Sequence, residues 1–221
     1  MSSPLLKENQ NITGSGRNHG IDLLRLALMF MVCMLHTLGQ GGILNASAEG
    51  TNAYRAYWFL EILSYCAVDG FAVISGYAAS NRPRKYDKIV NMWFQAFFYS
   101  FILTGVLTVI GISDSWATDD MIKCVFPITF NKFWYFTDFF ALFFAIPVLN
   151  KFLFSISEEV AKKALIIIFV LFSVLGIFND SFRTAGGYSA IWLIVLYCIG
   201  VLAKRVKLFE TRKNTTLIIL W

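Results

Sequence analysis

Three ionisable side chains lie within one apolar stretch of the chain, residues 21–38. Asp22 and Arg25 are three residues apart, and His36 follows eleven residues after Arg25. A helix turns about 100° per residue, so it would make Asp22 and Arg25 neighbours and return Arg25 and His36 to within about 20° of one face, roughly 16 Å apart along the axis. Ionisable groups in a spanning helix usually face the bundle interior or a polar cavity. The alternative is that all three are interfacial anchors.

His36 and Asp69 are the candidates for acid–base chemistry. A neutral imidazole can take a proton from a hydroxyl near pH 7, which makes His36 a candidate general base. The open alternative is a core histidine that is hydrogen-bonded to a neighbouring helix. Asp69 lies inside a second apolar stretch, where a carboxylate needs a partner. It could orient His36, pair with Arg25, or act as a purely structural polar clamp.

Polar and aromatic residues mark the ends of two further apolar stretches. Ser75 and Tyr77 flank Gly76, which permits a close helix approach or a bend. No G-x-S-x-G elbow surrounds Ser75, which favours packing or hydrogen bonding over nucleophilic catalysis. Trp134 and Tyr135 open a later stretch at the depth of an interfacial aromatic belt. Together with Tyr54 and Trp58, they are also the aromatic side chains that could contact a sugar.

A basic cluster follows the second apolar stretch. Arg82, Arg84, Lys85 and Lys88 place four cations within seven residues. The preference for positive charge on the cytosolic side of a membrane accounts for some of them. They could equally bind the phosphates of a cytosolic ligand, because arginine presents a bidentate fork to phosphate.

The composition identifies the class of protein. The chain has 221 residues, of which 57% are hydrophobic and 15% are charged, whereas a soluble domain has about 45–50% apolar and 25% charged residues. This predicts an all-α, polytopic membrane helix bundle. The net charge of +5 comes from basic residues in short loops, so membrane topology explains it better than nucleic-acid binding. Four cysteines without C-x-x-C spacing and only two histidines predict neither a disulfide framework nor a metal centre.

Apolar length predicts six complete transmembrane helices and a truncated seventh. The fifth segment has only 15 clearly apolar residues and must borrow from its flanks, and the seventh has eight residues, too few to cross a bilayer. Residues 1–20 are polar and predict a disordered cytosolic tail, followed by one membrane domain over residues 21–221. The six segments are residues 21–38, 57–79, 89–112, 133–149, 164–178 and 185–203; the seventh begins at residue 214.

The loops differ in their content of Lys and Arg. The N-terminal segment and the loops after the second, fourth and sixth segments hold most of these residues, whereas the other loops hold only Arg55, Lys123, Lys132 and Arg183. The positive-inside rule therefore places the N-terminus in the cytosol. His36 is then expected toward the external half of the first helix.

Four stretches, in order, resemble one family of membrane enzymes. RNHGIDLLRLALMFMVCMLH resembles the opening signature of the membrane acyltransferase 3 family, an Ile-Asp-x-x-Arg followed by a His. AVDGFAVISGY is similar to its second-helix signature. VFPITFNKFWYFTDFFALFFAIPVLN and GGYSAIWLIVLYCIGVLAKR resemble two later segments, and the four together cover most of residues 17–205.

The resemblance implies an O-acyltransferase of the bacterial inner membrane. Such enzymes move an acyl group, commonly acetyl from acetyl-CoA, to a hydroxyl of a surface glycan or lipid-linked saccharide, without a metal. The resemblance implies that His36 is the catalytic base, with Asp69 beside it in the second-helix signature. It implies donor contacts through Arg25, Arg82, Arg84 and Lys85, and we expect substrate contacts from Ser75, Tyr77, Trp134 and Tyr135.

The chain departs from the family pattern in two respects. Asp138 is unusual at its position, and relatives carry about ten spanning helices, so the chain is expected to be a fragment, a truncated reading frame or a chain that needs a partner. Two other interpretations stay open. In a translocator, Arg25, Asp69, Asp138 and His36 would line a substrate pathway. A truncated remnant would have no turnover. Binding of acetyl-CoA would distinguish the enzyme from a translocator.

Overall fold

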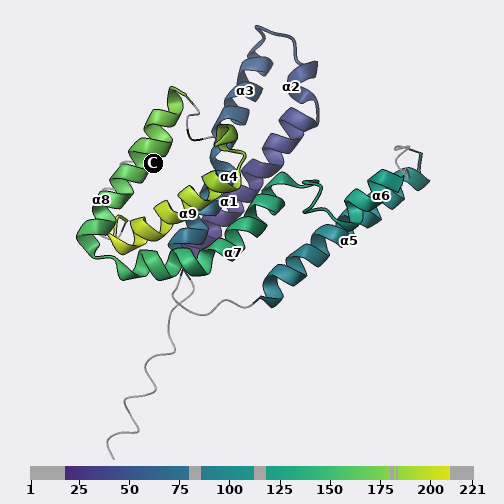
Figure 1. Ribbon diagram of the computed structural model, residues 1–221. Coiled ribbons are helices and arrows are strands. Elements are labelled where there is room, and N and C mark those ends of the chain that lie inside the picture. Colours follow the sequence, from purple (N-terminus) through teal and green to yellow (C-terminus); the bar gives the residue numbers. More distant parts are fainter. Residues whose placement is uncertain (1–17, 80–85, 112–117, 180–181, 183, 210–221) are drawn as a thin grey trace, which may run out of the picture. The chain divides into compact units, whose positions relative to one another are not determined.

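The computed structural model describes residues 18–79, 86–111, 118–179, 182 and 184–209, and over these residues the chain is all-helical apart from turns and loops. Figure 1 shows the order of the elements. The chain divides into two compact units, residues 1–71 and 72–221. Each unit is described by itself.

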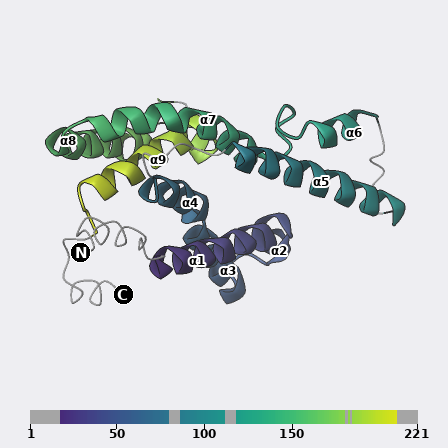
Figure 2. The same ribbon diagram turned by 90° about the horizontal axis from the view of Figure 1, so that it is seen from below.

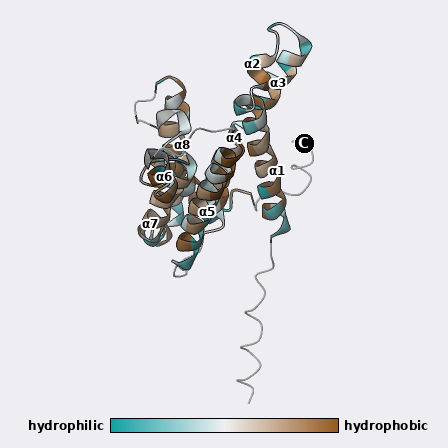
Figure 3. Ribbon diagram, turned by 90° about the vertical axis from the view of Figure 1, so that its right-hand side faces the viewer, coloured by the Kyte–Doolittle hydropathy of each residue, from teal (hydrophilic) through white to brown (hydrophobic). Residues whose placement is uncertain are grey.

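Five helical stretches in the described residues are long and apolar enough to cross a membrane. They match the first five predicted segments, and Figure 3 shows how hydrophobic residues predominate along them. The all-α class and the multi-pass membrane character are therefore confirmed. The five stretches are His19–Gln40, Asn52–Tyr77, Asp87–Val109, Trp134–Ser155 and Glu158–Ile177.

The first unit begins with α1 (His19–Leu35), which continues as a π-helical turn, η3 (His36–Gln40). Asn18 caps α1, because its side-chain oxygen accepts hydrogen bonds from the backbone N–H groups of Gly20 at 3.0 Å and Ile21 at 3.3 Å. The helix therefore starts two residues before the predicted position 21, and His19 and Gly20 are helical rather than part of a tail. The rest of the predicted tail, residues 1–17, lies outside the described residues.

A turn and a short helix reverse the chain. Gly42 has φ 80°, a left-handed conformation that glycine adopts without strain. It precedes α2 (Ile43–Ala46), and α3 (Asn52–Ser64) follows with Thr51 as its N-cap. α4 (Cys66–Tyr77) continues the same span after a break at Tyr65 and passes from the first unit into the second.

α1 packs side by side with α3 (Figure 1), and it meets α3 and the start of α4 in an antiparallel sense. Two close approaches fix the register. A Cβ atom on Gly70 would lie 2.7 Å from a methyl carbon of Leu28, and a Cβ atom on Gly39 would lie 3.1 Å from Oε1 of Glu61. Residues later in the first helix thus face residues earlier in the second, as expected for two spans joined by a short loop.

The second unit holds the remaining helices. They are α5 (Asp87–Val109), α6 (Thr118–Val125), α7 (Trp134–Ser155), α8 (Glu158–Phe169), the π-turn η4 (Val170–Val174), the 3-10 turns η5 (Leu175–Ile177) and η6 (Ala185–Gly187), and α9 (Ala190–Arg205). α7 and α8 both pack against α9 (Figure 2). Leu142 and Ile146 of α7 and Leu193, Val201 and Leu202 of α9 are fully buried and form the core of this unit.

Two glycines allow the end of α4 to cross α9 at backbone contact distance. A Cβ atom on Gly76 would lie 2.0 Å from the carbonyl oxygen of Tyr197, and one on Gly200 would lie 2.1 Å from that of Val73. Small residues permit this kind of approach between apolar helices. The predicted role of Gly76 in close helix approach is therefore confirmed.

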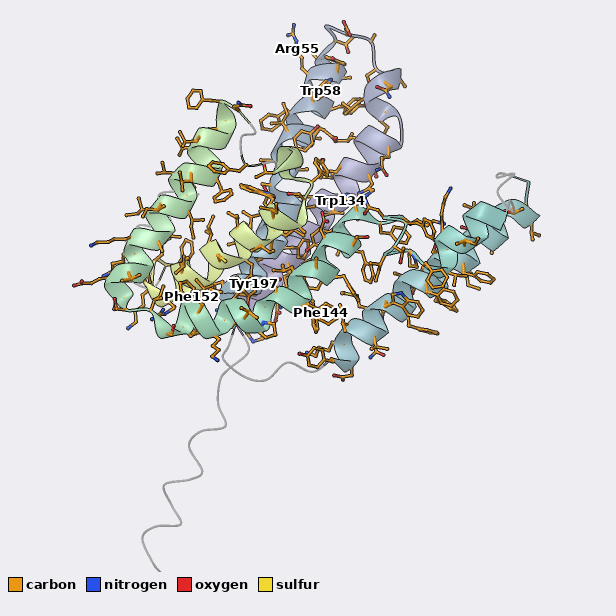
Figure 4. The ribbon with its side chains drawn as sticks, viewed as in Figure 1. Arg55, Trp58, Trp134, Phe144, Phe152 and Tyr197 are labelled. Atoms are coloured by element: carbon orange, nitrogen blue, oxygen red, sulfur yellow. The ribbon has the colours of Figure 1, made fainter. Side chains whose placement is uncertain are left out.

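Polar side chains also connect the helices of the second unit. The Tyr197 hydroxyl donates to Oδ1 of Asn150 at 2.7 Å, and both residues are buried. The Arg205 guanidinium donates to the carbonyls of Leu153 and Ile156 at the end of α7, the latter at 2.7 Å. Figure 4 shows Tyr197 on α9 beside α7.

The later boundaries differ from the predicted ones for local reasons. α7 runs to Ser155, past the predicted end at residue 149, because Lys151 is accommodated on an exposed part of the helix. The fifth segment does borrow from its flank, since Ser157 caps α8 and adds Glu158 and Glu159 to its first turn.

The sixth segment starts at Ala190 rather than residue 185, because Gly186 and Gly187, with φ of 63° and 101°, form a separate turn. With 16 residues, α9 rises about 24 Å against a hydrocarbon core of about 30 Å. The predicted seventh segment lies outside the described residues.

Candidate functional site

Asp22 and Arg25 lie at the start of α1. Their side chains form an ion pair in which Nη1 of Arg25 is 3.6 Å from Oδ1 of Asp22, with 46% and 31% of the two side chains exposed. The predicted neighbour relation of the two residues is confirmed. An ion pair this exposed contributes little to stability, so the guanidinium remains open to a ligand.

The His36 imidazole is exposed and held in one orientation by its own helix. Its Nδ1 lies 2.8 Å from the carbonyl oxygen of Val32. A carbonyl can only accept, so Nδ1 carries the proton and donates it, and in the neutral ring Nε2 keeps its lone pair. Among the described residues, Nε2 has no hydrogen-bond partner. The ring is therefore set up to accept a proton at Nε2.

The backbone at His36 departs from α-helical geometry. The carbonyl of His36 accepts from the N–H of Gly41 at 2.7 Å, a bond between residues five apart. Single π-turns of this kind are rare and often occur at functional sites. The predicted base therefore begins the irregular turn of its helix.

Glu61 of α3 is the acidic group beside this turn. The residue is 6% exposed, and its Oε2 has no hydrogen-bond partner among the described residues. Its Oε1 faces Gly39, three residues after His36 in the same π-turn. Sequence reasoning did not single out Glu61, although a lone acid in the run Trp58–Ile62 was a visible signal.

Asp69 lies at a different level of the first unit. It precedes Gly70, which touches Leu28, eight residues before His36. Eight helical residues correspond to about 12 Å along the axis. The catalytic role of Asp69 stays a prediction, and Glu61 is the carboxylate that the structure brings next to the π-turn.

The Ser-Gly-Tyr signature lies at the crossing of α4 with α9 in the second unit. Gly76 makes the backbone contact with Tyr197, and the Tyr77 ring packs on Phe209 with centroids 5.9 Å apart. Ser75 is half-buried in the same helix turn. These contacts are packing contacts, and the assignment of Ser75 and Tyr77 to substrate binding stays a prediction.

Trp134 and Tyr135 open α7, also in the second unit. The Trp134 ring contacts Tyr188 with centroids 4.6 Å apart, and the Tyr135 ring stacks on Phe139 at 6.1 Å. Both are half-buried, and Trp134 is labelled in Figure 4. The aromatic cluster is compatible with an interfacial belt or with a sugar platform. The basic residues Arg82, Arg84 and Lys85 lie outside the described residues.

One further polar cluster joins α6 and α5. Nζ of Lys132 donates to Sγ of Cys124 at 2.9 Å and to Oγ1 of Thr104 at 3.3 Å. Burial raises the pKa of Cys124, but hydrogen bonds with Lys132, Ser100 and Thr104 and the Lys132 charge lower it further, to below its ordinary value. The four cysteines are free thiols, and the described residues hold no cluster of three or more potential metal ligands.

The whole described chain matches one protein family. The match covers residues 18–221 and is to an acyltransferase domain. No curated protein and no solved structure matches the chain. The matched region begins at Asn18, the N-cap of α1, and includes the His36 turn, the Ser-Gly-Tyr signature and the α7 and α9 helices.

Proposed function

Since this chain belongs to the acyltransferase 3 family, a family of membrane O-acyltransferases, we propose that it moves an acetyl group from cytosolic acetyl-CoA to a hydroxyl of an extracytoplasmic glycan or lipid-linked sugar. The observation that carries the proposal is the hydrogen bond from His36 Nδ1 to the Val32 carbonyl. It leaves Nε2 as the proton acceptor that such a transfer requires.

The reaction follows from this arrangement. Nε2 of His36 takes the proton of the acceptor hydroxyl as the oxygen attacks the thioester carbonyl. The carbon–sulfur bond then breaks, and the leaving CoA thiolate takes the proton from the imidazolium. The products are an O-acetyl ester and free CoA, and the imidazole is regenerated. General-base catalysis of this kind contributes about 10²–10⁴-fold to a rate.

The donor is assigned to the basic residues. Arg25 would contact the donor from α1, and Arg82, Arg84 and Lys85 would bind the CoA phosphates from the cytosolic loop. Arg25 and His36 lie eleven residues apart, about 16 Å along a helix, a distance that an extended pantetheine arm can cover. A donor bound from the cytosol could thus present its thioester to His36.

The acceptor is assigned to the opposite side of the membrane. Trp134 and Tyr135 would stack against sugar rings there. Ser75 and Tyr77 end the second span on the cytosolic side and would contact substrate at that end, and Asp69 would assist His36 in catalysis. The loop charges support a cytosolic N-terminus in a bacterial inner membrane. α9 would complete a sixth crossing with residues that flank its 16-residue helix.

The test is a genetic replacement with matched histidine variants. Deletion of the gene is expected to remove one class of O-acetyl groups from the surface glycans, as measured by NMR of the purified glycans. The intact gene and His19→Ala should restore them, because His19 lies at the other end of α1. His36→Ala should not, with transfer reduced at least about 100-fold. Full restoration by His36→Ala, at equal protein level in the membrane, would contradict the proposal.

A further inference from the structure

Cys124 lies in a cluster of four polar side chains that the reaction above does not use. α6 packs against α5 (Figure 1), and the buried Sγ of Cys124 lies 3.3 Å from Oγ1 of Thr104. Nζ of Lys132 donates to the same sulfur at 2.9 Å and to Oγ1 of Thr104 at 3.3 Å. Ser100 completes the cluster from one turn earlier in α5.

A tight turn returns Lys132 to the helix that carries Cys124. The N–H of Asn131 donates to the carbonyl of Ile128 at 3.1 Å, and the N–H of Lys132 donates to that of Pro127 at 2.9 Å. Asn131 has φ 49°, a left-handed conformation that asparagine adopts more readily than most residues do. The local fold of the chain therefore holds the ammonium at the sulfur, although Lys132 itself is exposed.

The polar neighbours of the sulfur are groups that can donate hydrogen bonds. An ammonium has only donors, and the two hydroxyls can each rotate to point a hydrogen at the sulfur. A neutral thiol accepts weakly, so these surroundings favour the thiolate. Burial raises the pKa of Cys124, but the hydrogen bonds and the Lys132 charge lower it to below its ordinary value. In the described part of the chain, Lys132 is the charged group that acts on the sulfur, and α5 presents hydroxyls to it.

Ser100 places an otherwise unused hydroxyl against the sulfur. The residue is 3% exposed, and apart from the sulfur its Oγ has no hydrogen-bond partner among the described residues. A buried hydroxyl that lacks a good acceptor is unfavourable, and a protein that retains one usually uses it. An oxygen atom added to the sulfur would supply the acceptor that Ser100 lacks.

We propose that Cys124 is a modification site at which peroxides oxidise the thiolate to a sulfenic acid, with Lys132 as the proton donor. Sγ attacks one oxygen of the peroxide, and the O–O bond breaks as the S–O bond forms. The sulfur is oxidised by two electrons and the peroxide is reduced. The other oxygen takes a proton from the Lys132 ammonium and leaves, as water when the oxidant is hydrogen peroxide. Solvent then returns a proton to Lys132.

The buried position of the sulfur restricts the size of the oxidant. Cys124 is 1% exposed, so a bulky thiol reagent cannot reach the sulfur unless α6 moves. Hydrogen peroxide is uncharged and little larger than water, and the exposed Lys132 side chain leads from the surface to the sulfur. The cluster thus combines an activated thiolate with access for a small peroxide.

The first test compares cysteines within one chain. The full chain in lipid nanodiscs is treated with hydrogen peroxide at neutral pH and then denatured in the presence of dimedone, which traps sulfenic acids. Mass spectrometry of the peptides quantifies the product at each cysteine. Cys124 is expected to react about tenfold faster than Cys33 and Cys66, because the described residues place no cation on the sulfur of either. Equal rates at the three cysteines would overturn the proposal.

Lysine variants test the activation itself. Lys132→Gln removes the ammonium, so the oxidation of Cys124 should slow about tenfold, and Lys132→Arg should recover most of the rate. Lys123→Gln is the matched control, since it removes the same charge from α6 and Lys123 is not among the sulfur's partners in the described residues. A bulky maleimide applied to each folded variant reports whether α6 still covers the sulfur. Oxidation of a folded Lys132→Gln chain at the wild-type rate would contradict the proposal.

The wild-type chain alone decides the case in which Lys132→Gln does not fold. Below its pKa of about 8.5, an ordinary thiol oxidises about tenfold faster for each unit of pH, and free cysteine in the same buffer provides this reference. The oxidation rate of Cys124 should level off at a lower pH than that of free cysteine, because its thiolate forms at lower pH. If both rates rise in parallel up to the pKa of free cysteine, the proposal is wrong.

Discussion

Both units place polar groups among apolar helices, but they differ in whether those groups are hydrogen-bonded. The groups lie between α1 and α3 in the first unit, and where α4 and α7 pack on α9 in the second. Around α9, Tyr197 is hydrogen-bonded to Asn150, and Arg205 reaches the last carbonyls of α7. Around η3, the Nε2 of His36 and the Oε2 of Glu61 have no partner among the described residues. Paired polar groups fix a fold, whereas unpaired polar groups remain available to a ligand or a proton.

The glycines of the two units also differ in what they contact. Gly76 and Gly200 bring two backbones into contact, and the backbone carbonyls that they meet cannot move aside as a side chain can. Gly39 instead faces the end of a flexible side chain, Glu61. The same substitution should therefore affect stability in one unit and activity in the other.

Gly76→Ala is expected to have the largest effect on stability. The added methyl would lie 2.0 Å from the Tyr197 carbonyl, so α4 and α9 must separate, at a cost of about 1–3 kcal/mol or more. The thermal unfolding of the detergent-solubilised chain measures it. Gly176→Ala is the control, since nothing lies within 4 Å of that Cβ position. Equal stability of the two variants would show that the contact between α4 and α9 does not require glycine at position 76.

Tyr197→Phe is expected to have the next largest effect. It removes the buried 2.7 Å hydrogen bond to Asn150, which should destabilise the chain by about 1–2 kcal/mol. Tyr188→Phe serves as the control, because Tyr188 is 58% exposed and surface changes are usually within about 0.5 kcal/mol. Chemical denaturation in mixed micelles measures both. No difference between them would show that this bond does not stabilise the second unit.

Gly39→Ala is expected to have the smallest effect on stability and a moderate one on activity. The new methyl would lie 3.1 Å from Glu61 Oε1, and the carboxylate can move to relieve the contact. We expect unfolding close to wild type and acetyl transfer reduced about fivefold, or roughly 1 kcal/mol of barrier. Transfer at the wild-type rate would show that the position of the Glu61 carboxylate does not matter to the reaction.

Much of the fold could be predicted from local sequence features. The five long apolar stretches are continuous in the chain, and their length alone identifies them. The errors lie at their ends, where local chemistry decides: Asn18 extends α1 backwards, and the paired glycines at positions 186 and 187 delay α9. The break at Tyr65 between α3 and α4 has no comparable sequence signal.

The candidate site was predicted less completely. His36 could be identified because an imidazole is unusual in an apolar helix. The place of Glu61 beside the π-turn follows only from the antiparallel pairing of α1 and α3, which brings Gly39 and Glu61, 22 positions apart in the chain, together. The partner of Gly76 could not be predicted for the same reason, since Tyr197 lies 121 positions away.

The π-turn at residues 36–40 has a consequence for the register of the first helix. A π-turn holds about one residue more than an α-turn, so the segment after it is rotated by roughly 100° relative to an uninterrupted α-helix. The side of α1 that faces lipid therefore does not determine the direction in which Gly39 faces α3. Regular α-helical winding over the same five residues would keep every ionisable side chain and still turn Gly39 away from the acid that it accommodates.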